Sequence, residues 1–194
     1  MKIMKKKILS MVALLSATVA VMAQSVKCPD NNHPHAINLG LPSGIKWACC
    51  NVGAKMPSGY GSYFTWSNND IAYDNWGGSW RMPTKAQFEE LRDNSRVVPA
   101  TMNGINGCKF IGSNGGSIFI PLAGYDDADD SWDEDVKYVG EEGFYWTKSA
   151  YSKEGDEALF MSIDPIEVNE IERDDVRIQL WKRIDGLSIR PVCK

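Results

Sequence analysis

Histidine is nearly absent from this chain of 194 residues. The two histidines, His33 and His35, flank Pro34 near the start of the sequence. A Ser-His-Asp triad or a Cys-His dyad needs a histidine base inside the folded domain. The sequence after His35 contains no histidine. The glycine-rich segments also lack the Lys-Ser or Lys-Thr sequel of a phosphate-binding loop. These absences exclude histidine-based hydrolases and P-loop enzymes, and we predict that the protein is not an enzyme.

Long apolar runs are missing after the first 23 residues. Those residues combine four lysines near the start, an apolar run from Ile8 to Met22, and the small residue Ala23. This is the pattern of a secretory signal peptide, 1–23, cleaved after Ala23. The run is shorter than the roughly 20 residues of a membrane-spanning helix. We therefore expect an exported protein, secreted or at the cell surface, that does not span the membrane.

The next segment, 24–35, has little that favours regular structure. It is polar, contains two prolines and shows no periodicity, so we expect a leader with little structure. Its His-Pro-His sequence carries groups that bind transition metals, but in such a leader we expect no metal site. The rest of the chain, 36–194, fits a single domain with a sizeable core.

Positive charge is also scarce. The chain has 21 lysines and arginines against 25 acidic residues, a net charge of -4. Removal of residues 1–23 would take away four lysines and no acidic residue, leaving -8. Binding to nucleic acid depends on lysine and arginine that neutralise phosphates, so we expect no nucleic acid partner.

Short strand patterns separated by Gly, Asn, Asp and Ser occupy most of the domain. The alternation is clearest at 176–181, where Val176, Ile178 and Leu180 share one face. The nine candidate strands are 37–39, 45–48, 63–66, 108–111, 118–121, 144–148, 158–163, 176–181 and 187–191.

Only the segment near 85–94 is a convincing helix. Thr84 and Gln87 have the spacing of a capping box, and Phe88 and Leu91 give the helix one apolar face. Many strands with one main helix predict a β-rich α+β domain. A jelly roll or another sandwich is the alternative that the strand pattern leaves open.

Six sequence blocks carry a family resemblance: 38–48, 51–54, 76–84 (WGGSWRMPT), 117–121, 144–149 and 187–193 (LSIRPVC). They resemble the Fibrobacter succinogenes major paralogous domain family, and the resemblance covers Ala36 to the C-terminus. It implies a C-type-lectin-like fold with paired terminal strands, a helix beneath them and a long irregular loop region above. The family occurs in exported bacterial proteins whose role is mostly undefined, so the resemblance implies a fold more directly than a function.

The resemblance also suggests how the cysteines pair. Five cysteines leave at least one thiol outside any intramolecular pair. Cys193 lies in the last block and Cys50 directly precedes the block 51–54, so we expect a disulfide between them, and Cys49 with Cys108 is a weaker second pair. Such disulfides persist in exported proteins.

Arg81 and Arg190 each stand near a proline in the two strongest blocks. In packed surroundings rich in tryptophan, we expect such an arginine to hold backbone carbonyls or a buried carboxylate.

Seven carboxylates fill the ten positions 126–135, which we call the acidic loop. Oxygen-only clusters suit Ca²⁺, and the resemblance implies that this loop lies in the irregular region where lectin-like folds bind ligands. The loop lacks the glycine and glutamate spacing of an EF-hand, so a solvated loop without an ion is the alternative. The candidate Ca²⁺ ligands are Asp126, Asp127, Asp129, Asp130, Asp133 and Asp135.

The chain is rich in tryptophan and tyrosine, which stack on sugar rings or anchor protein partners. Trp47, Trp80 and Trp146 lie in the blocks and are expected in the core. The candidate ligand surface consists of Tyr125, Trp132, Tyr138, Tyr151 and Trp181.

These observations favour an exported, non-catalytic binding or surface-interaction module whose ligand is a glycan or a surface protein. One alternative is a structural or assembly component of a cell-surface complex, with the odd cysteine bridging two chains. A less favoured alternative is a secreted hydrolase that uses paired carboxylates.

Overall fold

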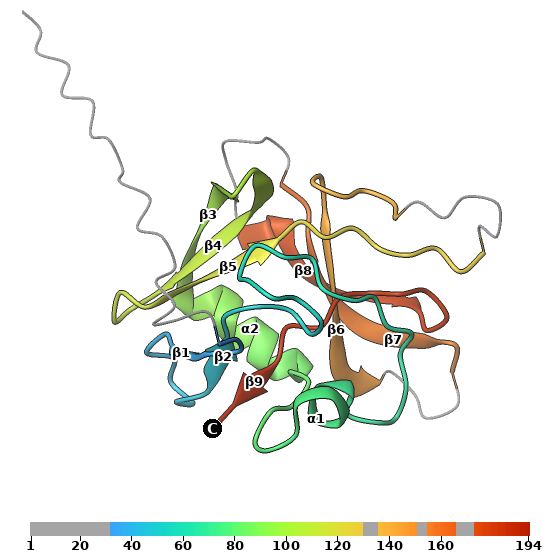
Figure 1. Cartoon of the computed structure of the whole chain (residues 1–194), viewed down its shortest axis with the longest axis horizontal. Helices are drawn as coiled ribbons and strands as arrows, with labels where there is room; N and C mark the ends of the chain where they lie inside the picture. The colour runs from blue at the N-terminus through green and yellow to red at the C-terminus, as the bar shows by residue number, and fades with distance from the viewer. Residues whose placement is uncertain (1–31, 130–135, 151–154, 166–172) are drawn as a thin grey trace, which may run out of the picture.

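The computed structural model describes residues 32–129, 136–150, 155–165 and 173–194. Over these residues the chain forms nine β-strands and two α-helices, and the strands make three small antiparallel sheets (Figure 1). The predicted β-rich α+β class is therefore confirmed. Three small sheets differ from the two facing sheets of a jelly roll. The predicted signal peptide, 1–23, lies outside the described residues.

The first sheet joins the two ends of the domain. Its central strand pairs on both sides, so Trp47 lies opposite Ile37 in one neighbour and Val192 in the other. The predicted return of the chain's end to its early strands is confirmed, and Figure 1 shows these strands together. In spatial order the strands are β1 (Ala36–Asn38), β2 (Lys46–Ala48) and β9 (Val192–Cys193).

The other two sheets are three-stranded meanders. One contains β3 (Ser95–Met102), β4 (Ile105–Gly112) and β5 (Ser117–Pro121). The other contains β6 (Gly143–Ala150), β7 (Glu157–Ile163) and β8 (Val176–Lys182), with the 3₁₀ helix η1 (Arg173–Asp175) before β8. The sequence analysis missed β3, which contains Pro99 and follows a helix without a turn. Pro99 is tolerated because β3 is an edge strand.

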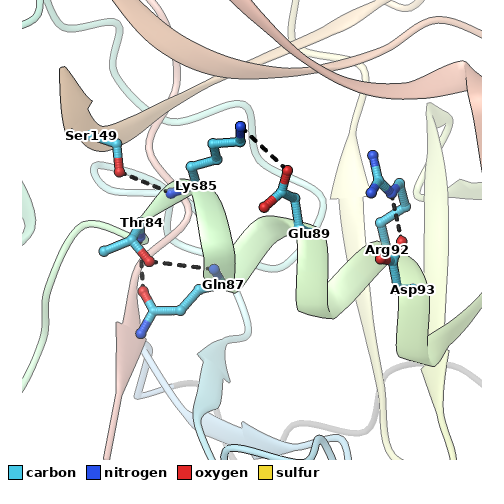
Figure 2. Close-up of polar contacts among 7 residues, drawn as sticks. All are labelled: Thr84, Lys85, Gln87, Glu89, Arg92, Asp93 and Ser149. Atoms are coloured by element: carbon cyan, nitrogen blue, oxygen red, sulfur yellow. Dashed lines mark hydrogen bonds and ion pairs between the residues drawn. The ribbon is translucent and has the colours of Figure 1, made fainter. Parts of the chain in front are cut away.

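The predicted helix is confirmed as α2 (Lys85–Asn94). Its first turn is held by the predicted capping box, in which Thr84 Oγ1 accepts from the Gln87 N–H and Gln87 Oε1 accepts from the Thr84 N–H. The Lys85 N–H donates to Ser149 Oγ at 3.1 Å, which ties the helix start to β6 (Figure 2). Phe88 and Leu91 form its buried face.

A second helix, α1 (Ile71–Trp76), was not predicted. Its capping residue Asp70 accepts from the Tyr73 N–H at 3.2 Å and from the Met82 N–H at 2.9 Å. The helix is too short to show a helical period, so it depends on this cap and on the burial of Ile71 and Ala72.

Two predicted strands, 63–66 and 187–191, are isolated bridges in the structure. Phe64 and Leu187 exchange both backbone hydrogen bonds, at 3.0 and 3.1 Å. The carbonyls of Ile189 and Pro191 then accept from the N–H groups of Val52 and Ala48. The segment 187–191 changes partner along its length, so it bonds to several segments in turn and forms no continuous ladder.

The main core lies where α2 packs against the sheets. Phe88 of α2 contacts the buried Trp47 with ring centroids 5.1 Å apart. A second cluster surrounds Trp146. Burial of Trp47 and Trp146 confirms the prediction, whereas Trp80 is only half-buried and lies edge-on to Trp76 at 5.4 Å.

None of the four described cysteines forms a disulfide, so the predicted Cys50–Cys193 pair and the second pair, Cys49–Cys108, are both absent. The register of the first sheet explains the absence of the first pair. Cys193 lies opposite Lys46, four residues before Cys50. The strand pairing therefore places Cys193 beside Lys46, whereas Cys50 follows the end of β2 at Ala48.

Among the described residues, no helix has both the length and the apolar character needed to cross a bilayer.

Candidate functional site: an aromatic groove on the third sheet

A groove lies on the β6–β7–β8 sheet, where aromatic and polar side chains meet. Its volume is about 320 Å³, which falls in the range of small-molecule pockets. We call it the aromatic groove. The residues that line it are Tyr125, Tyr138, Glu142, Phe144, Phe160, Ser162, Asp164, Arg177, Gln179 and Trp181.

The β-strand period places most of these side chains. Arg177, Gln179 and Trp181 alternate along β8, so they share one face. In β7, Phe160 lies opposite Gln179 and Ser162 lies opposite Arg177. The register of two neighbouring strands therefore builds the floor of the groove.

The other face of β8 confirms the predicted alternation. Val176 is buried in the main core, and Ile178 packs against the same cluster. The burial of this apolar face leaves the opposite face of β8 for the groove.

Aromatic rings form the groove in two levels. Tyr138, which is 50% exposed, stacks on Tyr125 with centroids 6.1 Å apart and an interplanar angle of 24°. Tyr125 meets Trp181 and Phe144 edge-on, each at 5.1 Å. Beneath them, Phe144 stacks on the buried Phe160 at 5.6 Å. The exposed Tyr138 ring thus rests on the half-buried Tyr125, which packs against the buried Phe144.

Backbone contacts hold the two tyrosines. Tyr125 exchanges two hydrogen bonds with Lys137, at 3.0 and 2.9 Å, which places Tyr138 next to this pair. Tyr138 has a φ of 57°, in the left-handed region, and its carbonyl accepts from the N–H groups of Glu141 and Glu142 at 3.0 Å. A residue other than glycine in this region costs about 1–3 kcal/mol, and such positions concentrate at functional sites.

Polar groups lie beside the rings. Gln179 Nε2 donates to Ser162 Oγ at 2.9 Å, and Arg177 Nε donates to the Asp174 carbonyl at 2.6 Å. Burial, together with the neighbouring charges of Asp164 and Glu141, raises the pKa of Glu142. The groove therefore combines an apolar stacking surface with an amide, a guanidinium and two carboxyl groups.

The acidic loop begins beside the groove. The backbones of Asp126 and Gly186 pair through two hydrogen bonds of 2.8 Å. Asp127 Oδ1 accepts from the Asp129 N–H at 3.1 Å, and the Asp129 carboxylate forms an ion pair of 2.5 Å with Lys182. In the described part of the loop, the Asp127 carboxylate thus stabilises a turn and the Asp129 carboxylate forms an ion pair. The remaining candidate Ca²⁺ ligands, Asp130, Asp133 and Asp135, lie outside the described residues.

Of the five predicted ligand-surface residues, the structure brings together Tyr125, Tyr138 and Trp181. Trp132 and Tyr151 lie outside the described residues. The sequence analysis missed Arg177 and Gln179, although the alternation that it found in 176–181 places them on the same face as Trp181.

No protein-family model, curated protein or solved structure matches this chain.

Proposed function

We propose that the protein binds a glycan in the aromatic groove as an exported, non-catalytic binding module. The observation that carries this proposal is the exposed Tyr138 ring, stacked on Tyr125 above a buried aromatic layer. Flat, supported rings pack against the apolar faces of sugars at small cost in conformational entropy. Gln179 and Arg177 offer hydrogen-bond donors beside the rings for sugar hydroxyls.

We further propose that residues 36–194 form a C-type-lectin-like domain of the Fibrobacter succinogenes major paralogous family. Support comes from the pairing of β9 with β2, which joins the ends of the domain, and from α2 packed against the adjoining core. In this proposal the acidic loop belongs to the upper region of the domain. Because Tyr125 and Lys137 enclose it, Ca²⁺ bound there would adjoin the groove.

A glycan array with the purified protein tests the binding proposal. We expect selective, saturable binding of at least one glycan class, and a repeat in EDTA reports whether Ca²⁺ takes part. Tyr138→Ala should weaken binding about fivefold, because it removes a ring contact of about 1 kcal/mol.

The matched control is Tyr73→Ala. Tyr73 lies on α1, outside the groove, and its exposed fraction of 48% is close to the 50% of Tyr138. We expect wild-type affinity from this control. Equal affinities of the two variants, or an array without selective binding, would contradict the proposal.

One observation favours a second candidate, glycan hydrolysis. The raised pKa of Glu142 has the neighbouring Asp164 as its second cause, after burial. Glycosidases use two carboxyl groups, one of which is kept protonated by its environment. If the protein releases reducing ends from the glycan that it binds, and Glu142→Gln abolishes the release without loss of binding, hydrolysis replaces simple binding as the function.

A further inference from the structure

Three potential metal ligands meet at the edge of the first sheet, which is a different sheet from that of the aromatic groove. His33 Nδ1 lies 3.2 Å from Cys49 Sγ, and His35 Nδ1 lies 3.8 Å from the same sulfur. The ligand atoms of the three residues all lie within 4.8 Å of one another. Cys49 is buried and the two histidines are half-buried. The segment 32–35 thus contacts the domain through Cys49.

The β1–β2 ladder explains why these side chains meet. Ala36 lies opposite Ala48, so the next pair outward is His35 with Cys49. The Cys49 N–H donates to the His35 carbonyl at 2.9 Å, and the His35 N–H donates to Cys49 Sγ at 3.1 Å. His33 reaches the same sulfur from the segment before β1, with its Nδ1 3.2 Å from Cys49 Sγ. Strand register therefore places Cys49 beside His35, and His33 completes the cluster at the end of the sheet.

The two nitrogen-to-sulfur distances fit a tetrahedral metal. Zn–N bonds of about 2.0–2.1 Å and Zn–S bonds of about 2.3 Å give a nitrogen-to-sulfur edge of about 3.5 Å. The observed values of 3.2 and 3.8 Å lie on either side of that edge. The two rings are 5.1 Å apart and cross at 81°, so each can direct a nitrogen to a common centre without stacking on the other.

We propose that His33, His35 and Cys49 bind Zn²⁺. Imidazole nitrogen and thiolate sulfur are the ligands that zinc prefers, whereas Ca²⁺ and Mg²⁺ require oxygen ligands, which this cluster lacks. Three protein ligands occupy three corners of the tetrahedron, and the fourth is left for water or an incoming group.

Zinc binds the thiolate form of cysteine. The His35 N–H donates to Cys49 Sγ at 3.1 Å and so holds this sulfur beside the two imidazoles.

Titration of the purified, untagged protein with Zn²⁺, and with Co²⁺ as a spectroscopic substitute, tests the site. We expect one equivalent to bind, with a thiolate-to-cobalt charge-transfer band and the absorption of tetrahedral Co²⁺. His33→Gln and His35→Gln should each weaken Zn²⁺ binding about tenfold or more. Because the chain contains only two histidines, every imidazole signal in a proton NMR spectrum reports this site, and both should shift with zinc.

Cys49→Ser should remove the charge-transfer band, while Cys193→Ser, at another cysteine of the first sheet, should keep it. If Cys49→Ser fails to fold, the two histidine variants decide the result by themselves. Absence of saturable zinc binding, binding of copper alone, or unchanged zinc affinity in both histidine variants would overturn the proposal. None of these measurements depends on glycan binding.

Discussion

Arg190 donates from Nε to Asn51 Oδ1 across 2.8 Å, and this contact fixes the end of the chain to the loop after β2. The same guanidinium donates to the carbonyls of Ala48 and Phe119, at 3.1 and 2.9 Å. Arg190 is fully buried with these acceptors. One side chain thus joins three segments that are far apart in sequence, which confirms the predicted role of Arg190 as an anchor of carbonyls.

Arg190→Met should destabilise the fold by about 3 kcal/mol or more. The variant leaves three buried acceptors without their donor, and hydrogen bonds to charged groups are worth about 1.5–3 kcal/mol each. Urea unfolding measures the change. As a control, Arg81→Met should lower the free energy of unfolding by about 1 kcal/mol or less, because Arg81 is exposed. The partners of its side chain are the carbonyls of Gly78 and Trp80 and the ring of Tyr73. Equal losses in the two variants would contradict the anchoring role.

Thr84→Ala should cost about 1 kcal/mol of folding free energy, because it removes the side-chain half of the capping box of α2. Lys85→Ala is the matched control in the neighbouring position. It removes only an exposed pair with Glu89 at 3.6 Å (Figure 2), so its effect should stay within about 0.5 kcal/mol. Chemical denaturation of both variants gives the comparison. A Thr84→Ala variant as stable as the wild type would show that packing of Phe88 and Leu91 alone fixes the helix start.

Gly112→Ala should destabilise the protein more strongly than Gly44→Ala. A Cβ at Gly112 would collide with the carbonyl oxygen of Leu39, so the end of β4 and the segment after β1 would have to separate. Gly44 has open space around it and a φ of +70°, so alanine there carries only the strain of the left-handed region, about 1–2 kcal/mol. The melting temperatures of the two variants measure this difference. The reverse order would mean that the backbone at Gly112 shifts without cost.

The raised pKa of Glu142 predicts a pH dependence of stability. The folded state holds the Glu142 proton to higher pH than the unfolded state, whose carboxyl titrates near 4.5. The contribution of this group therefore falls as pH rises above that value. Glu142→Gln should stabilise the protein at about pH 7, and the gain should disappear at about pH 4.

Melting temperatures of wild type and variant at the two pH values measure this effect. Glu157→Gln, which changes an exposed carboxylate at the start of β7, should leave the melting temperature nearly unchanged at both. A gain from Glu142→Gln that is equal at both pH values would disprove the role of the carboxyl proton.

Local sequence predicted the elements whose hydrogen bonds are also local. The bounds of α2 followed from Thr84, Gln87 and the spacing of Phe88 and Leu91, because capping and i, i+3 contacts lie within one segment. The alternation in 176–181 correctly gave the buried face of β8, because the two-residue period of a strand is independent of its neighbours. In contrast, α1 depends on a hydrogen bond that the Asp70 carboxylate accepts from the Met82 N–H, beyond the helix itself.

The candidate sites show the same division between what local sequence predicts and what depends on distant contacts. The sequence by itself determined which residues are suited to chemistry: the tyrosines and tryptophans that stack, the histidines and cysteines that ligate, and the scarcity of bases. Only the tertiary structure decided which of them meet. Strand register sets Cys193 opposite Lys46 and away from Cys50, and it brings Cys49 to His35, since a contact between distant segments depends on how strands align and not on the residues themselves.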